Sequence, residues 1–383
     1  MLLRAAQFFH SSCNACGAEA LMGLRAQMIL AAPQVLAWAG LAIGVVFGMV
    51  VERTRFCAVG ALSDLHAFND RRRLRAWLLA SAVAIIGAQS LSSLALVDLG
   101  LSTYLSGSFN WLGNILGGFM FGIGMVFAGG CGSRNLVRVG AGDARAAVVL
   151  MVMGICAYMT ISGVFGPLRV ALESATAITL PTATDQSLAT VLSLVSGWSR
   201  PATRALASVV VAGGLLFYCL YDGEFRRSPT LWLGGAVVGL CVVAAWAVSG
   251  LVYDEFAAEP QLPQGLSFVR PSGDTLQYLE RYTANPVPRF GVAAVFGTVL
   301  GAFLAAFSAG RFKLVGFADG ADTLRNLTGA ALMGVGGVVA MGCTIGQSVT
   351  GVSTLAVGSL LAAVALLAGG MVGLRMLERW LPG

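Results

Sequence analysis

The sequence predicts an all-α polytopic membrane protein with about nine transmembrane helices, short broken helices and two inverted repeats. Three observations support this class. Hydrophobic residues make up 57% of the 383 residues, and the mean hydropathy is +0.80. Charged residues make up 11%, whereas soluble domains hold about 25%. A glycine-rich apolar segment that ends in Gly-Cys occurs twice along the chain.

A membrane-spanning helix needs about 20 apolar residues. Segments 206–221 and 327–342 are marginal in length, and a short apolar segment that ends in glycines can form a half-helix at a binding site. The nine predicted spans, taken in order, are 33–51, 76–98, 111–129, 143–165, 206–221, 230–251, 290–309, 327–342 and 352–374.

Lys and Arg in the loops predict the orientation of the chain. Loop 52–75 carries Arg53, Arg55 and the run RRRLR at 71–75, so we expect it to face the cytoplasm. With nine spans, the N-terminus then lies outside and the C-terminus inside. The net charge of +6 is explained by this topology signal, and no nucleic-acid partner is predicted.

We expect residues 1–32 to form an N-terminal extension without a fixed structure. Met22 and Met28 are alternative starts, so the sequence leaves open whether 1–27 is the native beginning. The rest, 33–383, is predicted to be one transmembrane transporter domain. Its expected parts are a first half at 33–251, a link rich in proline and acid at 252–289, and a second half at 290–374.

The internal repeat appears when residues 114–140 are set over 326–352, at an offset of 212 without a gap. Nine of 27 positions are identical, and they include Gly130-Cys131 over Gly342-Cys343. The spans that end at these cysteines are the third and the eighth, so they run in opposite directions. Similar sequence in opposite direction is the inverted repeat found in many transporters.

The two Gly-Cys motifs predict breaks in a helix at membrane depth, which are tolerated only inside protein or along a wet cavity. The helix after such a break presents free N–H groups and a positive dipole end, both of which favour an anion. Nearby hydroxyl, amide and guanidinium groups could contact the same anion. The candidate substrate-binding residues of the two motifs are Gly130, Cys131, Gly132, Ser133, Arg134, Gly342, Cys343, Thr344 and Gln347.

A third cysteine, Cys57, lies in "VERTRFCAVGALSDL" at the inner end of the first span. A thiol is a weak donor and a weak acceptor, which makes it a poor ligand for sulfate. It suits a sulfur atom better, because both are soft and polarizable. A substrate with anionic oxygens and an exposed sulfur, such as thiosulfate, would use both kinds of group. The alternative for each cysteine is a small buried residue at a tight helix contact.

The segments "RTRFCAVGALSDL", "GGCGSRNLVRVG" and "MGCTIGQ" resemble the three cysteine signatures of the YeeE/YedE sulfur-transport family, in that family's order and rough spacing. The likeness extends from about residue 35 to the C-terminus. It implies a bacterial inner-membrane protein with an hourglass of spanning and broken helices. It also implies thiosulfate uptake by S–H···S hydrogen bonds to Cys57, Cys131 and Cys343, and a cytoplasmic sulfur-carrier protein as partner.

The chain departs from the thiosulfate-transporting members after its first Gly-Gly-Cys, where "GSRNLVR" replaces small residues. Arg134 in this segment could alter charge selectivity, so other sulfur anions and selenium analogues remain candidate substrates. The oligomeric state and the coupling ion are not indicated by the sequence.

A second class of function is an enzyme, a membrane thiol-disulfide oxidoreductase or a sulfurtransferase, with Cys131 or Cys57 as nucleophile. No histidine accompanies these cysteines as a base, so a non-enzymatic transporter is preferred. The chain has no P-loop of the form GxxxxGK[ST], and no cofactor is predicted. His10, Cys13 and Cys16 resemble part of a metal site, but structural zinc takes four ligands, so no metal is predicted either.

Overall fold

The computed structural model describes residues 28–29, 31–179, 185–255, 257, 260–284 and 286–380. Most of the expected N-terminal extension, with His10, Cys13 and Cys16, lies outside these residues. The longer helices are α2 (Ala32–Thr54), α4 (Arg72–Ser93), α5 (Trp111–Phe127), α7 (Ala144–Ile161), α10 (Arg200–Leu220), α12 (Pro229–Leu251), α14 (Phe290–Ser308), α15 (Gly320–Val339) and α16 (Val357–Trp380).

Short elements connect these helices. They are α3 (Ala58–Phe68), the 3-10 turns η1 (Leu99–Leu101) and η2 (Thr103–Leu105), α6 (Gly132–Gly140), α8 (Gly166–Thr176), α9 (Leu188–Ser196), α11 (Gly223–Arg226), α13 (Val269–Glu280) and the π-helical turn η3 (Gly346–Gly351). Two strands of two residues, β1 (Ser108–Phe109) and β2 (Ile178–Thr179), pair antiparallel.

In the described part of the chain, eight helical segments are long and apolar enough to cross a membrane, so the predicted all-α polytopic membrane class is confirmed. The eighth predicted span, 327–342, is not among them. It belongs to α15, which begins several residues earlier. Asp319 caps this helix by accepting a hydrogen bond from the amide of Asp322 at 2.7 Å. Asp322 and Arg325 make the first turns of α15 polar, and the apolar part of the helix is correspondingly short.

The centre of the fold is a close crossing of α5 and α15. A methyl group on Gly117 would lie 2.6 Å from the carbonyl oxygen of Gly336, and one on Gly329 would lie 2.7 Å from that of Gly124. Residues 117 and 124 correspond to 329 and 336 at the offset of 212. Each glycine therefore contacts the counterpart of the other, as in a two-fold symmetric interface. The two helices run antiparallel, which confirms the opposite directions predicted from the repeat.

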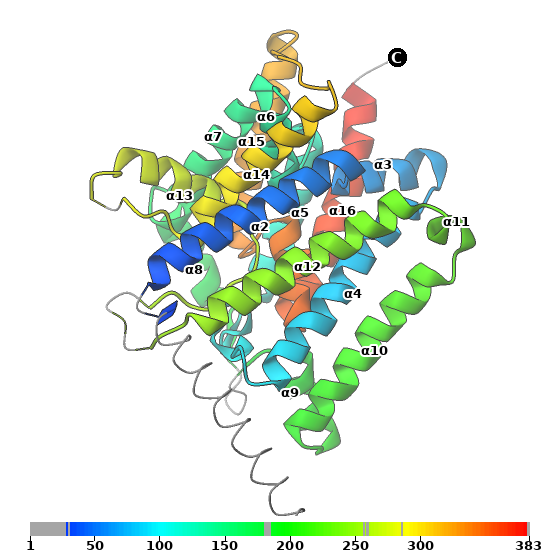
Figure 1. Ribbon diagram of the computed structural model, residues 1–383, viewed down its shortest axis with the longest axis vertical. Coiled ribbons are helices and arrows are strands. Elements are labelled where there is room, and N and C mark those ends of the chain that lie inside the picture. Colours follow the sequence, from blue (N-terminus) through cyan, green and yellow to red (C-terminus); the bar gives the residue numbers. More distant parts are fainter. Residues whose placement is uncertain are drawn as a thin grey trace, which may run out of the picture.

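Two further helix pairs match each other in the same way. Gly40, Gly44 and Gly48 of α2 lie against the backbone of α14, and the two helices are parallel and adjacent (Figure 1). Gly235 and Gly239 of α12 lie against the backbone of α4, also in parallel. Small residues at such positions allow helix backbones in a membrane to pack closely. The contacts of α12 with α4 are thus the counterpart of those of α2 with α14.

These contacts suggest unit boundaries that differ from the expected halves. We propose that one unit comprises α2 to α7 and the other comprises α12 to α16. In this division α12 corresponds to α2, although the sequence placed it in the first half. Helix α13, within the expected link 252–289, corresponds to α3, because α3 packs on α4 and α16 while α13 packs on α14 and α7.

Helix α10 lies between the two units in sequence and at the edge of the molecule (Figure 1). It packs on α4 and α9, and its other face exposes apolar side chains such as Val209, Val210 and Phe217. Such a face is expected where a helix meets lipid.

The symmetric crossing makes a stability prediction. Gly124→Leu should destabilise the protein by more than about 2 kcal/mol, because the added side chain meets backbone atoms of α15 that cannot move away. The measurement is thermal unfolding of the purified protein in detergent. Gly213→Leu on α10 is the matched control, since nothing lies within 4 Å of its missing side chain. Equal melting temperatures for the two variants would contradict the tight crossing.

Candidate functional site

Both Gly-Cys motifs form the same helix break. At the end of α5, the amide of Gly129 donates to the carbonyl of Val126, and the amide of Gly130 donates to that of Met125 at 2.8 Å. The end of α15 repeats the pattern, with Gly342 donating to Gly337 at 2.7 Å. This is a Schellman motif, and it satisfies carbonyls that would otherwise be unpaired inside the protein. Its left-handed residue is Gly129, with φ of 68°, in the first copy and Met341, with φ of 59°, in the second.

Side chains one turn further on hold each break in place. In the first copy, the Asn135 amide donates to the carbonyl of Gly130 at 2.7 Å. In the second, the Gln347 amide donates to the carbonyl of Ala340. Positions 135 and 347 correspond in the repeat, so the two amides have equivalent roles. Arg138 adds hydrogen bonds to the carbonyls of Ala128 and Gly129, each at 3.2 Å.

Cys131 and Cys343 directly follow the two breaks and lie at the starts of the next helical segments. The sulfur of Cys343 accepts hydrogen bonds from the amides of Phe268 and Gly346, both at 3.3 Å. Cys131 lies 3.3 Å from the hydroxyl of Ser133, and either group can be the donor.

Cys57 caps α3, and its sulfur accepts a hydrogen bond from the amide of Gly60 at 3.4 Å. At the repeat offset its counterpart is Val269, so the third thiol belongs to one unit only. Cys131 and Cys343 belong to one buried cluster, which also contains Phe56 and Ala58, the two sequence neighbours of Cys57. The structure therefore brings the three predicted cysteines to the same part of the core.

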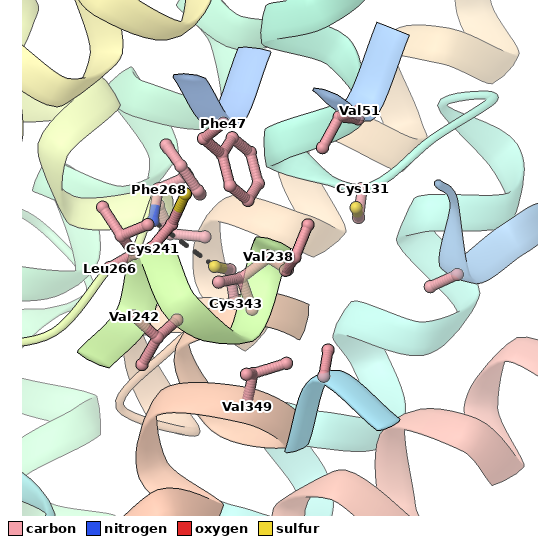
Figure 2. Close-up of a cluster of buried hydrophobic side chains, with 14 of the residues drawn as sticks. Phe47, Val51, Cys131, Val238, Cys241, Val242, Leu266, Phe268, Cys343 and Val349 are labelled. Carbon is pink, nitrogen blue, oxygen red and sulfur yellow. Dashed lines mark hydrogen bonds between the residues drawn. The ribbon is translucent and has the colours of Figure 1, made fainter. Parts of the chain in front are cut away.

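The two central thiols are buried in an apolar environment. Cys131 and Cys343 are each 1% exposed. Figure 2 shows them among side chains of one buried cluster, including Phe47, Val238 and Val349, with the hydrogen bond to Cys343 dashed. Phe47 and Phe268 stack at a tilt, with ring centroids 5.1 Å apart. This conformation therefore closes the thiols off from water on both sides.

Neutral polar groups surround Cys343. The hydroxyl of Thr344 and the side-chain oxygen of Gln347 are buried, and neither has a hydrogen-bond partner in the described part of the chain. A hydroxyl can donate to an oxyanion, whereas the Gln347 oxygen only accepts, so Thr344 fits the predicted role better. Ser267 lies 3.8 Å from the sulfur of Cys343. Burial raises the pKa of the nearby Tyr104 hydroxyl, and a charge on Cys343 would raise it further, so Tyr104 remains a donor.

The two arginines of the first motif are paired with carboxylates. Arg138 contacts Asp143 at 2.7 Å. Burial alone would raise the pKa of Asp143, but hydrogen bonds from Arg145 and Arg138 lower it on balance. Arg134, predicted to contact the substrate, lies 3.4 Å from Glu52. Neither arginine is therefore an isolated positive charge, and Arg138 mainly stabilises the helix break.

Three glycines complete the predicted site. Gly130 and Gly132 flank Cys131, and Gly342 precedes Cys343, so they shape the backbone at the breaks. Among the described residues no group of three or more metal-ligating side chains occurs. His66, the histidine of the described ranges, lies 3.1 Å from Glu378 and is not placed to activate a thiol.

Three residues of the candidate site were not identified from the sequence. Glu52 directly follows the first predicted span, and the sequence alone assigns it no role. An acidic residue at membrane depth nevertheless indicates a functional site. Asn135 could have been found, because the repeat aligns it with Gln347. The amide of Phe268 gave no signal, since a backbone donor to Cys343 depends on how distant segments pack.

The helices broken next to buried thiols and uncharged donors define a multi-pass membrane transporter. The profile described as sulphur transport matches residues 53–372, and the chain belongs to that family. It is 29% identical to the thiosulfate transporter TsuA of Escherichia coli over 80% of this chain and 85% of that protein. It is 30% identical to TsuA of Spirochaeta thermophila over 87% and 96%. The probable transporter YedE of Salmonella typhimurium is 34% identical over 26% and 23%.

The two helix breaks lead to a second stability prediction. A non-glycine residue in the left-handed region costs about 1–2 kcal/mol, so Met341→Gly should stabilise the protein by about 1 kcal/mol in thermal unfolding. Met151→Gly, at an exposed position within α7, is the control and should cost about 1 kcal/mol. If both changes lower the melting temperature, the packing of the Met341 side chain stabilises the protein by more than its left-handed backbone destabilises it.

Proposed function

We propose that this chain takes up a small sulfur-containing oxyanion through the bacterial inner membrane, with thiosulfate as the first candidate. The observation that carries the proposal is that Cys131, Cys343 and the two sequence neighbours of Cys57 belong to one buried cluster beside the two helix breaks. The names of the two TsuA relatives, which align along most of their length, support the choice of substrate.

In this proposal the substrate passes from Cys343 to Cys131 and then to Cys57. Thiosulfate carries three anionic oxygens and one exposed sulfur. Its sulfur can accept a hydrogen bond from each thiol in turn, because the thiols are soft and weak donors. Its oxygens can bind Thr344, Ser133 and the amides at the start of α6, where the helix dipole favours an anion. Weak contacts that hold the substrate only briefly also allow it to leave.

The proposed orientation has the N-terminus outside and the C-terminus inside, so that Cys343 lies toward the outer face and Cys57 toward the cytoplasm. Moving a dianion inward opposes the membrane potential by about 2.3 kcal/mol per charge per 100 mV. Rapid consumption inside by a soluble sulfur-carrier protein, or cotransport of a cation, would supply this energy.

Uptake of sulfur-labelled thiosulfate into proteoliposomes tests the proposal. Cys131→Ala and Cys343→Ala should each lower the initial rate by at least tenfold, because each removes one donor from the path. Cys219→Ala is the control, since α10 lies outside both proposed units and the Cys219 thiol donates to the carbonyl of Arg75 on α4. Normal uptake by Cys131→Ala would remove the central thiol from the mechanism. No uptake by the intact, folded chain would exclude thiosulfate and point to another sulfur or selenium anion.

The same samples separate transport from the enzymatic alternative. Mass spectrometry after uptake should show no persulfide on Cys57, Cys131 or Cys343, because the proposed contacts are not covalent. A lasting persulfide on one of them would instead indicate a sulfurtransferase.

Orientation has its own test. A protease-sensitive tag after residue 383 should be cleaved in inside-out vesicles and protected in right-side-out vesicles. The reverse pattern would invert the proposed path.

A further inference from the structure

The first motif contains a charged pair that its counterpart lacks. Arg134 corresponds to Gly346 in the repeat, and α12, the counterpart of α2, contains no Asp or Glu at all. A side chain at Gly346 would meet the Ser267 hydroxyl at 2.8 Å and the Tyr104 hydroxyl at 3.4 Å. The Cys343 side of the path is therefore lined by neutral groups, whereas the Cys57 side holds a buried carboxylate and a guanidinium.

The carboxylate of Glu52 is shared between two arginines. One oxygen lies 3.4 Å from Arg134, and the other lies 3.7 Å from Arg311, which follows α14. The Glu52 side chain is 10% exposed, while those of Arg134 and Arg311 are 21% and 36% exposed. Both contacts are longer than a tight bidentate pair. Glu52 could therefore move toward Arg311 without becoming an unpaired buried charge.

Arg134 also acts on the thiol path. It lies 3.4 Å from Glu52, which precedes Cys57 by five residues, and it belongs to the first turn of the helix that begins after Cys131. An anion between these two thiols would therefore approach Arg134 directly. An unpaired arginine in such a poorly hydrated place would bind a dianion strongly and release it slowly, whereas an arginine paired with Glu52 would do neither.

We infer that Glu52 and Arg134 form a charge gate at the Cys57 end of the path. At rest the carboxylate occupies Arg134 and closes the path. When an oxyanion arrives, it displaces the carboxylate, which moves to Arg311, and the return of Glu52 then expels the anion. This inference rests on the proposed function, and it makes Glu52 the residue that prevents the substrate from being trapped.

Transport kinetics should separate the two partners. Glu52→Gln leaves Arg134 free for the anion, so KM and the maximal uptake rate should both fall, each by about tenfold or more. Arg134→Gln leaves Glu52 to repel the anion, so KM should rise by about tenfold or more. If the pair only stabilised the fold, both variants would yield less folded protein. KM would then stay unchanged, or it would shift in the same direction in both variants.

Labelling of Cys57 tests the gate even if thiosulfate is not the substrate. Detergent-solubilised protein is treated with a methanethiosulfonate that bears a sulfonate, and separately with one that bears a trimethylammonium group. The rate at Cys57 is followed by peptide mass. The ratio of the anionic to the cationic rate should rise at least threefold in Glu52→Gln and fall at least threefold in Arg134→Gln.

The matched controls are Arg169→Gln and Glu173→Gln, which break an ion pair of 2.8 Å with 23% and 28% exposed side chains on α8. They should leave both KM and the labelling ratio unchanged. Labelling ratios that stay constant or shift together in the two gate variants would overturn the gate. If the intact chain takes up no thiosulfate but the two gate variants still shift the labelling ratio in opposite directions, thiosulfate is excluded as the substrate and the gate stands.

Discussion

Hydrogen bonds of the backbone at the two helix breaks determine how the rest of this structure is arranged. A chain that stops being helical inside a membrane protein must pair its amides and carbonyls within the protein. Here the Schellman bonds pair part of each break, and Asn135 and Gln347 pair carbonyls beside them. In the antiparallel crossing, the break after α5 lies beside Gly329 of α15, and the break after α15 lies beside Gly117 of α5. The cysteines that follow both breaks belong to one buried cluster.

The surroundings of the thiols explain why sulfur rather than a charged residue occupies the path. A full charge at this depth is costly unless it is paired, and the arginines here are indeed paired with Glu52 and Asp143. A thiol costs little to bury and still offers one hydrogen to a soft acceptor. In the proposed function, selection against hard oxyanions would follow from the weakness of this donor.

Sequence patterns predicted the helical membrane class, the antiparallel repeat and the three cysteines, because hydropathy and glycine spacing are local signals. The number and ends of the helices were less certain, since the polar start of α15 depends on its Asp319 cap. The role of Arg134 was predicted only in part. Its partner Glu52 lies 82 residues earlier in the chain, and no local pattern connects positions that only tertiary packing brings together. The donors to Cys343 were missed for the same reason.

Helix α10 has a consequence for how the chain is threaded. With the boundaries proposed above, each unit contributes four long helices, and an even number of passes returns a chain to the side from which it started. A second unit joined directly to the first would therefore begin on the same side and run parallel to it. The single pass of α10 shifts the start to the opposite side. A peripheral helix that contributes none of the three candidate thiols is thus what makes the repeat antiparallel, and it lets α5 and α15 cross side by side in opposite directions.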